Sequence, residues 1–312
     1  MQNETEELRS KNQMDGIVFG ALSYLMWGVL PLYWKLLAQV PSDEILAHRI
    51  IWSFVFVTAI LLFSKGLGKF AKEMCNKKSL VLMSLCSVLI AANWFTYIWA
   101  VNSGHVIETS MGYYINPLIA VFFGITILKE KLNAYKYISL ALAAIGVILT
   151  VVRYGRVPWV ALTLAITFAL YGLLKKLIVV ESLVGLAMES VILTPLALIY
   201  VAFKQMNGTG ALFNISLPTL FLLACAGVVT ATPLLLFAKG AKRVELSTLG
   251  FLQYISPTIT LILGVFVFKE RFTESDFLCF GFIWAALVIY SLSNVLGTKG
   301  LSLIKNISNK FS

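Results

Sequence analysis

Charged residues are scarce in this chain of 312 residues, because Asp, Glu, Lys and Arg together make up only 13% of it. An ordinary soluble domain holds about twice that share, and it uses the charge to cover its core with a polar surface. Hydrophobic residues instead reach 59%, with a mean hydropathy of +0.86. The surplus apolar surface must therefore face lipid rather than water.

Histidine and cysteine are also scarce, with two His and four Cys in the chain. No CxxC pair occurs, so the sequence gives no basis for a zinc site, a redox site or a disulfide framework. We expect each cysteine to pack as a small apolar residue. We therefore predict no metal and no cofactor. The four cysteines are Cys75, Cys86, Cys225 and Cys279.

The motifs of common hydrolytic enzymes are missing as well. The sequence contains no Walker A phosphate loop, no HExxH zinc motif and no GxSxG nucleophile motif. We therefore expect a protein that is not an enzyme. The net charge of +10 would suggest nucleic-acid binding in a soluble protein. Here the basic residues lie in short clusters between apolar stretches, so we predict no nucleic-acid partner.

Long apolar stretches are what the chain does contain. A membrane-spanning helix needs about 20 mostly apolar residues. We predict an all-α polytopic membrane protein with ten transmembrane helices, surrounded by membrane lipids. Residues 1–15 are hydrophilic and acidic, so we expect a cytoplasmic segment there and no signal peptide. The ten predicted spans are 16–38, 45–63, 80–101, 107–128, 133–152, 157–174, 183–203, 216–238, 246–268 and 274–294.

The basic residues predict how these helices are oriented. With ten spans, 18 of the 25 Lys and Arg lie in segments on one side, six lie on the other, and Arg49 lies inside a span. Cytoplasmic segments are the ones enriched in Lys and Arg. We therefore predict a cell-membrane protein with both termini in the cytoplasm, including a C-terminal tail at 295–312.

Two segments of the chain resemble each other. Residues 114–130 read YINPLIAVFFGITILKE, and residues 254–270 read YISPTITLILGVFVFKE. They share Tyr, Pro, Gly and a Lys-Glu pair at the same spacing, which similar composition does not readily produce. We interpret this as a duplication, with a first repeat at 16–152 (helices 1–5) and a second at 153–294 (helices 6–10).

Each repeat holds an odd number of helices, so the second must insert upside down relative to the first. Inverted repeats recur in carriers, where two mirrored halves exchange inward-open and outward-open states around a central site. We therefore predict a secondary transporter of a small solute that works by alternating access. A membrane-embedded enzyme and a non-transporting membrane scaffold are the alternatives.

Several stretches carry a resemblance to a known family. The sequence resembles the EamA-type branch of the drug/metabolite transporter superfamily, and its RarD group most closely. The resemblance covers nearly the whole chain and implies two five-helix EamA repeats, permease activity and the plasma membrane of a bacterium. It names no solute. The matching stretches are 43–52 (DEILAHRIIW), 93–102 (NWFTYIWAVN), 112–117 (GYYINP), 171–172 (YG) and 247–257 (STLGFLQYISP).

Ionisable residues within the predicted spans are candidates for the transport site, because such groups are costly in a membrane. Aligning the repeats places Arg49 opposite Glu189. We predict that these two are coupled across the repeat interface. The alternative is that both lie near helix ends and reach the membrane surface. His48 titrates near neutral pH and could couple transport to a proton, or it could simply bond a neighbouring helix.

Two polar and aromatic clusters precede prolines at matched positions, before Pro117 and before Pro257. A proline inside a spanning helix frees a backbone carbonyl, which is tolerated beside a cavity or other polar groups. We predict that these clusters, together with two residues spaced i and i+4 on the third helix, line a central solute site. The alternative is an aromatic belt at the membrane surface. The candidates are Asn93, Tyr97, Tyr114, Asn116, Gln253 and Tyr254.

Overall fold

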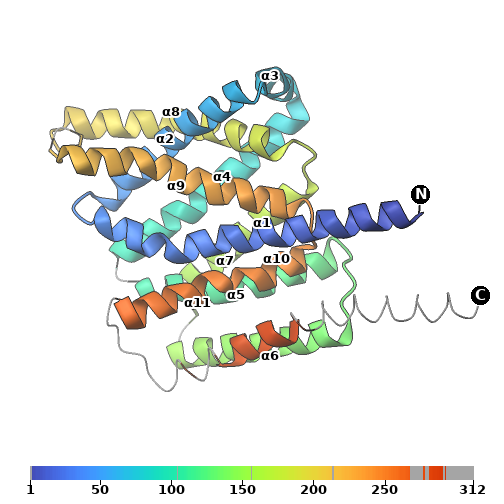
Figure 1. Cartoon of the computed structure of the whole chain (residues 1–312). Coiled ribbons are helices and arrows are strands. Elements are labelled where there is room, and N and C mark those ends of the chain that lie inside the picture. Colours follow the sequence, from blue (N-terminus) through green and yellow to red (C-terminus); the bar gives the residue numbers. More distant parts are fainter. Residues whose placement is uncertain are drawn as a thin grey trace, which may run out of the picture.

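The computed structural model describes residues 2–103, 105–155, 157–212, 214–267, 277, 281–290 and 292. All regular structure in these ranges is helical, and the helices lie side by side in a bundle (Figure 1). Residues 281–290 are helical as well. The main helices are α1 (Gln2–Leu36), α2 (Ser42–Phe63), α3 (Leu67–Cys75), α4 (Lys77–Asn102), α5 (Val106–Thr126), α6 (Ala134–Tyr154), α7 (Trp159–Leu177), α8 (Ser182–Met206), α9 (Leu217–Ala241), α10 (Leu246–Gln253) and α11 (Ile255–Ile262), followed by a π-helical turn at Leu263–Val267.

Eight helices in the described ranges are long and apolar enough to cross a membrane. Two further helical stretches, Met111–Thr126 and Gly281–Tyr290, are apolar but shorter. The predicted all-helical membrane architecture is confirmed. The number of ten spans stays a prediction, because the last predicted span lies partly outside the described residues. The predicted tail at 295–312 lies entirely outside them.

Helix α3 lies between the second and third predicted spans, 45–63 and 80–101, where no helix was predicted. Phe70 and Met74 pack against the main hydrophobic core, whereas Lys69 and Lys72 are exposed. Apolar residues four apart on one face and lysines on the other make a short amphipathic helix. Helix α1 also begins earlier than predicted, at Gln2. Its first residues are rich in Glu, Gln and Lys, which favour helix.

The two matched prolines have different effects on their helices. Pro117 lies inside α5, which continues through it. Pro257 follows a break at Tyr254 that separates α10 from α11. A proline clashes with the carbonyl four residues earlier, which here belongs to Gln253, the last residue of α10. The ninth predicted span is therefore divided into two short helices and a π-helical turn.

Helix contacts tie the two halves of the chain together. Helix α5 packs against α7 and α10, and α2 packs against α8 and α9. Helix α1 packs against α9, α10 and α11, while α4 packs against α7 and α8. Helices α2 and α9 approach each other closely at Gly227, where an added Cβ would lie 2.2 Å from the carbonyl carbon of Trp52. Only glycine permits that contact.

Helices α2 and α8 run antiparallel (Figure 1). Asp43, at the start of α2, forms a 3.0 Å ion pair with Lys204, near the end of α8. At the other end, Lys69 of α3 forms a 2.9 Å ion pair with Glu181, which directly precedes α8. These contacts at opposite ends fix the register of the two helices.

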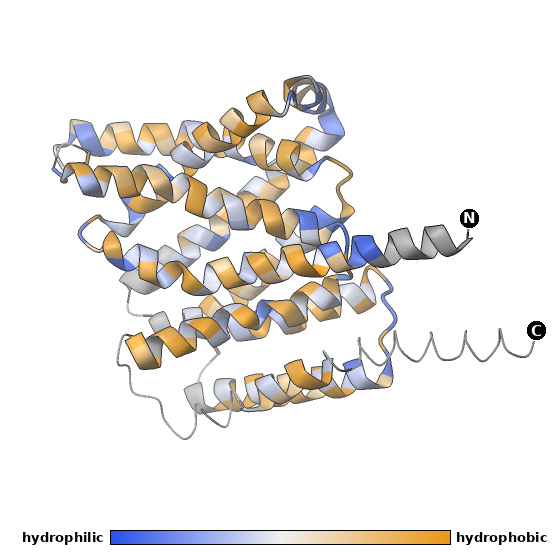
Figure 2. Cartoon of the chain, viewed as in Figure 1, coloured by the Kyte–Doolittle hydropathy of each residue, from blue (hydrophilic) through white to orange (hydrophobic). Residues whose placement is uncertain are grey.

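Much of the bundle surface is apolar (Figure 2). On α8, for example, Leu196, Ile199 and Phe203 are 68%, 67% and 61% exposed. Their spacing of three and four residues places them on one face of the helix. Exposed apolar surface of this extent is unstable in water and suits contact with lipid tails.

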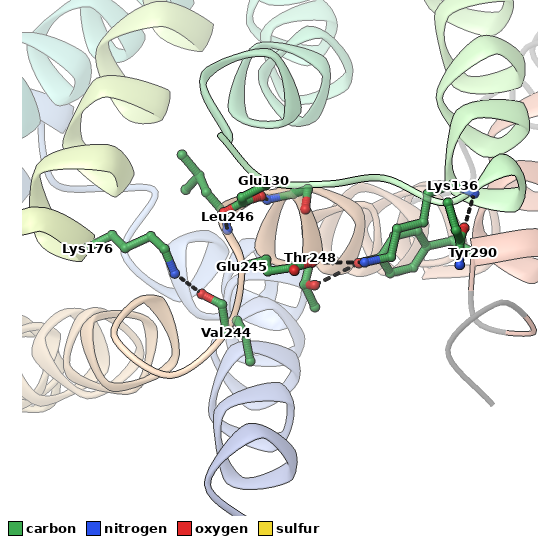
Figure 3. A network of polar contacts seen from close by, with 10 residues as sticks. Glu130, Lys136, Lys176, Val244, Glu245, Leu246, Thr248 and Tyr290 are labelled. Atoms are coloured by element: carbon green, nitrogen blue, oxygen red, sulfur yellow. Dashed lines mark hydrogen bonds and ion pairs between the residues drawn. The ribbon is translucent and has the colours of Figure 1, made fainter. Parts of the chain in front are cut away.

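Polar contacts gather at the turn between α9 and α10 (Figure 3). Glu130, after α5, accepts hydrogen bonds from the backbone N–H groups of Leu246 (2.6 Å) and Ser247 (3.0 Å). Lys136 of α6 forms a 2.9 Å ion pair with Glu245. The network connects the first half of the chain to the start of α10. Two more bonds belong to it, from Lys176 to the carbonyl of Val244 and from Tyr290 to Thr248.

Candidate functional site

A cavity lies between α2, α4, α8 and α9, with about 350 Å³ of space not filled by atoms, including its mouth. Its polar lining comes from Ser53, Glu189 and Ser190, and Trp94 forms part of the wall. The rest is aliphatic. The part of this space that a water-sized sphere can enter is only about 20 Å³, so the cavity is nearly closed in this conformation, and it is the mostly aliphatic lining that suits the apolar body of a solute. We refer to it as the first cavity.

Glu189 is buried beside the first cavity and is neutralised there. Its Oε1 lies 2.6 Å from Nζ of Lys175, which is 2% exposed. The hydroxyl of Tyr171 donates a 3.2 Å hydrogen bond to Oε2. Tyr171 and Lys175 are one turn apart on α7, so both project toward α8. The ion pair is thus built between consecutive helices of the second half.

Arg49 on α2 has a different environment. Its Nε donates a 2.9 Å hydrogen bond to the hydroxyl of Thr230 on α9. The guanidinium lies 4.8 Å from the ring centroids of both Trp34 on α1 and Trp94 on α4. In the described ranges of the chain, no carboxylate lies within ion-pair distance of it. Arg49 is therefore held by aromatic faces rather than by an acid.

Arg49 and Glu189 are not paired in this structure, and the antiparallel packing gives the reason. Arg49 lies six residues after Asp43, and Glu189 lies fifteen residues before Lys204, the partner of Asp43. At a rise of about 1.5 Å per residue, the two charges differ by about 13 Å along the helices. Positions equivalent in the sequence repeat are thus at similar distances from opposite ends. Their coupling stays a prediction.

His48 is 3% exposed, next to Arg49 in sequence. Its Nε2 is buried and has no hydrogen-bond partner in the described ranges. A buried imidazole nitrogen without a partner carries a desolvation cost that a hydrogen bond from a solute or from water would relieve. The predicted role in proton coupling is not tested by this geometry.

A second, smaller cavity of about 210 Å³ lies between α1, α5, α7, α9 and α10. Two of the predicted site residues, Asn116 and Gln253, line it together. Asn116 donates a 2.6 Å hydrogen bond to the carbonyl of Ala165 on α7. These two candidates come from the clusters before Pro117 and before Pro257, at positions that do not match in the alignment, and the fold brings them to one space.

An aromatic cluster separates the two cavities. Tyr24, Phe168 and Phe237 line the second cavity. Tyr171, whose hydroxyl contacts Glu189 of the first cavity, stacks on Phe237 with ring centroids 5.9 Å apart. Trp27 contacts the same ring at 5.8 Å. A solute passing from one cavity to the other would have to displace these rings.

The remaining candidates lie in helix interfaces. Asn93 donates hydrogen bonds to the carbonyl of Leu164 and to the hydroxyl of Thr167, both 2.9 Å, and so joins α4 to α7. Tyr254 is fully buried, and its hydroxyl donates a 3.2 Å hydrogen bond to the carbonyl of Tyr114. Neither tyrosine lines the two cavities described above.

The surroundings of Arg49 also include Tyr97, one of the predicted site residues, and Tyr113. Both interact electrostatically with Arg49, and their ring centroids are 6.3 Å apart.

The residues that sequence reasoning missed around the charges are Lys175, Tyr171, Trp34 and Thr230. Lys175 directly follows the sixth predicted span, 157–174, and Trp34 lies near the end of the first, 16–38. No group of three or more His, Cys, Asp or Glu in the described ranges could hold a metal ion.

Comparison with known proteins agrees with the fold. The pattern of the EamA-like transporter family matches residues 14–152 and 157–292. A Bacillus subtilis (strain 168) protein named uncharacterized transporter YojE is 49% identical over 284 residues, covering 90% of this chain and 94% of that protein. Protein RarD of Escherichia coli (strain K12) is 36% identical over 286 residues, covering 92% and 97%.

A crystal structure of another protein superposes with a TM-score of 0.69 at 18% identity, covering 89% of this chain and 97% of that chain. Identity this low supports the fold alone. The apolar helices and the bacterial relatives together indicate a multi-pass membrane protein of bacteria. On the family match and the near-complete coverage of its relatives, this chain belongs to the EamA-like transporter family.

Proposed function

We propose that this protein is a secondary transporter that moves a small metabolite or drug-like solute across the plasma membrane by alternating access. The observation that carries the proposal is the clustering of intramembrane charges around the first cavity, in a chain of a transporter family. Glu189 lines that cavity, and Arg49 contacts Trp94 in its wall. Charges are retained at membrane depth where they serve a solute or ion path.

Ten spans in two inverted repeats are part of this proposal. The two segments matched by the family pattern, 14–152 and 157–292, support two repeats. The helix contacts also support an exchange of halves. The exchange replaces α1 with α7, α2 with α8, α4 with α9, and α5 with α10 and α11. It turns the contact of α1 with α9 into that of α7 with α4. It likewise turns the contact of α5 with α7 into that of α10 and α11 with α1. Such an exchange is what an inverted pair of halves requires.

Alternating access needs contacts between the halves that can open on one side at a time. The ion pair of Asp43 with Lys204 joins the halves at one end of α2. The bonds of Glu130 to the start of α10 and of Lys136 to Glu245 join them at the α9–α10 turn. We assign the first contact to the external side and the others to the cytoplasmic side, with both termini cytoplasmic.

Solute flux tests this function. An untargeted metabolite comparison of deletion and overexpression strains would nominate solutes, and purified protein in liposomes should then accumulate at least one of them. Linking Asp43→Cys to Lys204→Cys with a short bismaleimide should stop the flux. The single cysteine variants treated in the same way should keep it. Conversion of a solute without net movement would indicate the membrane enzyme, and absence of flux for every nominated solute would indicate a scaffold.

A further inference from the structure

The two cations beside the first cavity differ in how they are neutralised. Lys175 has a carboxylate at 2.6 Å and is 2% exposed. Arg49 has only the hydroxyl of Thr230 at its Nε, and no acid in the described ranges. Lys175 is thus compensated within the protein itself. Arg49 therefore calls for a different explanation, since an unpaired cation at this depth is costly.

The geometry around Arg49 leaves the hydrogen-bonding edge of its guanidinium for a ligand. The group has five N–H donors, and Nε–H uses one of them on Thr230. The four donors on the terminal nitrogens make no hydrogen bond to a described residue, and Tyr97 and Tyr113 interact with the guanidinium only electrostatically. Trp34 and Trp94, each 4.8 Å from the guanidinium carbon, cover its planar surface and restrict its orientation. Aromatic faces hold a guanidinium without competing for its N–H groups.

The position of Arg49 connects it to the first cavity. Ile50, the next residue, and Ser53, one turn along the same helix, both line that cavity. Trp94 belongs to both the cavity wall and the aromatic cover of Arg49. Helix α2 carries Arg49 about 10 Å from its first residue, Ser42, which is within the membrane-spanning part. An anionic group at Arg49 would thus have its attached body directed along an aliphatic wall.

We infer that Arg49 binds the carboxylate of the transported solute, and that this solute is a small monocarboxylate with an apolar body. A planar guanidinium with two free terminal nitrogens matches a carboxylate through two parallel hydrogen bonds. The aliphatic lining of the first cavity matches an apolar body. The inference rests on the proposed transport function and adds the class of solute to it.

Binding to the purified wild-type protein in detergent tests the inference without requiring transport. The probes are phenylacetate, benzoate and hexanoate, with phenylacetamide as the neutral match and phenethylamine as the cationic match of phenylacetate. Isothermal titration and thermal unfolding should detect at least one carboxylate, and neither matched compound. Equal affinity for phenylacetamide, or binding of none of the carboxylates, would overturn the inference.

Variants then locate the site. Arg49→Lys keeps the charge but loses the paired hydrogen bonds, so carboxylate affinity should fall at least about tenfold. Arg49→Gln should lose binding altogether, and Lys69→Gln, on the exposed α3, is the control that should not change it. If Arg49→Gln does not fold, Arg49→Lys decides alone. Unchanged affinity in a folded Arg49→Lys protein would refute the assignment.

Two further experiments distinguish solute binding from lipid binding, and the solute class from the transport function. Phosphatidylglycerol in mixed micelles offers an anionic lipid head group, and Arg49-dependent binding of that lipid with none of the carboxylates would overturn the solute assignment. Flux assays in liposomes separate the inference from the function. Transport of a cationic or neutral solute, unaffected by carboxylates, would leave the transporter standing and refute the solute class. Arg49-dependent carboxylate binding without any flux would do the reverse.

Discussion

The ion pair between Lys175 and Glu189 makes a sharp prediction about stability. Both side chains are almost fully buried, at 3% and 4% exposure, and their charged atoms are 2.6 Å apart. Removing one partner leaves the other charge buried without compensation, which costs about 3–5 kcal/mol. Replacing both partners with apolar side chains of similar volume is often neutral or stabilising. Lys175→Met alone should therefore be much less stable than Lys175→Met combined with Glu189→Leu.

The chain offers a matched control for this double-mutant cycle. Lys69 and Glu181 also form an ion pair between two helical segments, at 2.9 Å, but their side chains are 72% and 54% exposed. Exposed pairs contribute about 0–1 kcal/mol. The same substitutions, Lys69→Met and Glu181→Leu, should therefore change stability little, singly or together.

The measurement is the free energy of unfolding of purified protein in mixed micelles, obtained by titration with dodecyl sulfate. We expect an interaction energy above about 2 kcal/mol for the buried pair and below about 1 kcal/mol for the exposed pair. Similar interaction energies for the two pairs would refute the reasoning that burial makes this pair structurally indispensable. Flux by the double variant would show in addition that the pair does not carry a coupling proton.

Two other predictions follow from the packing and the charge distribution. Gly227→Ala places a Cβ 2.2 Å from the backbone of Trp52, so it should lower the free energy of unfolding by about 1–3 kcal/mol. Gly68→Ala is the control, because nothing lies within 4 Å of a Cβ added there. Equal free energies of unfolding for the two variants would contradict the close approach of α2 and α9. In a background without native cysteines, an impermeant maleimide applied to intact cells should label Ser103→Cys and leave Lys72→Cys unlabelled, because the 18-to-six division of basic residues predicts that α3 is cytoplasmic. The opposite labelling pattern would refute the predicted topology.

The sequence predicted the helices well because their signal is local. Continuous apolar stretches indicate spanning helices whatever their neighbours are. The exceptions depend on packing. Helix α3 forms because Phe70 and Met74 find the core, which the charge-rich composition of that stretch conceals. The break between α10 and α11 lies just before Pro257, and α5 has no such break before Pro117. The matched sequence therefore does not determine whether the helix is interrupted.

The candidate site was predictable in its residue types and less so in its partners. Membrane depth singled out Arg49 and Glu189, and both lie at or beside the first cavity. Their partners come from tertiary contacts that no periodicity reveals. Lys175 lies near a helix end, where a lysine ordinarily reaches the membrane surface. Here its ion pair with Glu189 on α8 holds it inside the bundle, while the next residue, Lys176, reaches the α9–α10 turn instead.

The repeat alignment explains why the two charges need separate partners. In the proposed inverted arrangement, a position near one face of the membrane maps onto a position near the other face, so the aligned Arg49 and Glu189 would be equivalent without being close. Each charge must then find its partners at its own depth in the membrane. Glu189 obtains a cation from the adjacent helix of its own half. Arg49 is surrounded by tryptophan and a hydroxyl, and this leaves one uncompensated positive charge beside the first cavity. The resulting positive electrostatic potential favours an anion beside Arg49, whichever solute supplies it. A transporter built this way would reject cations at Arg49 by repulsion as much as it attracts carboxylates by hydrogen bonding.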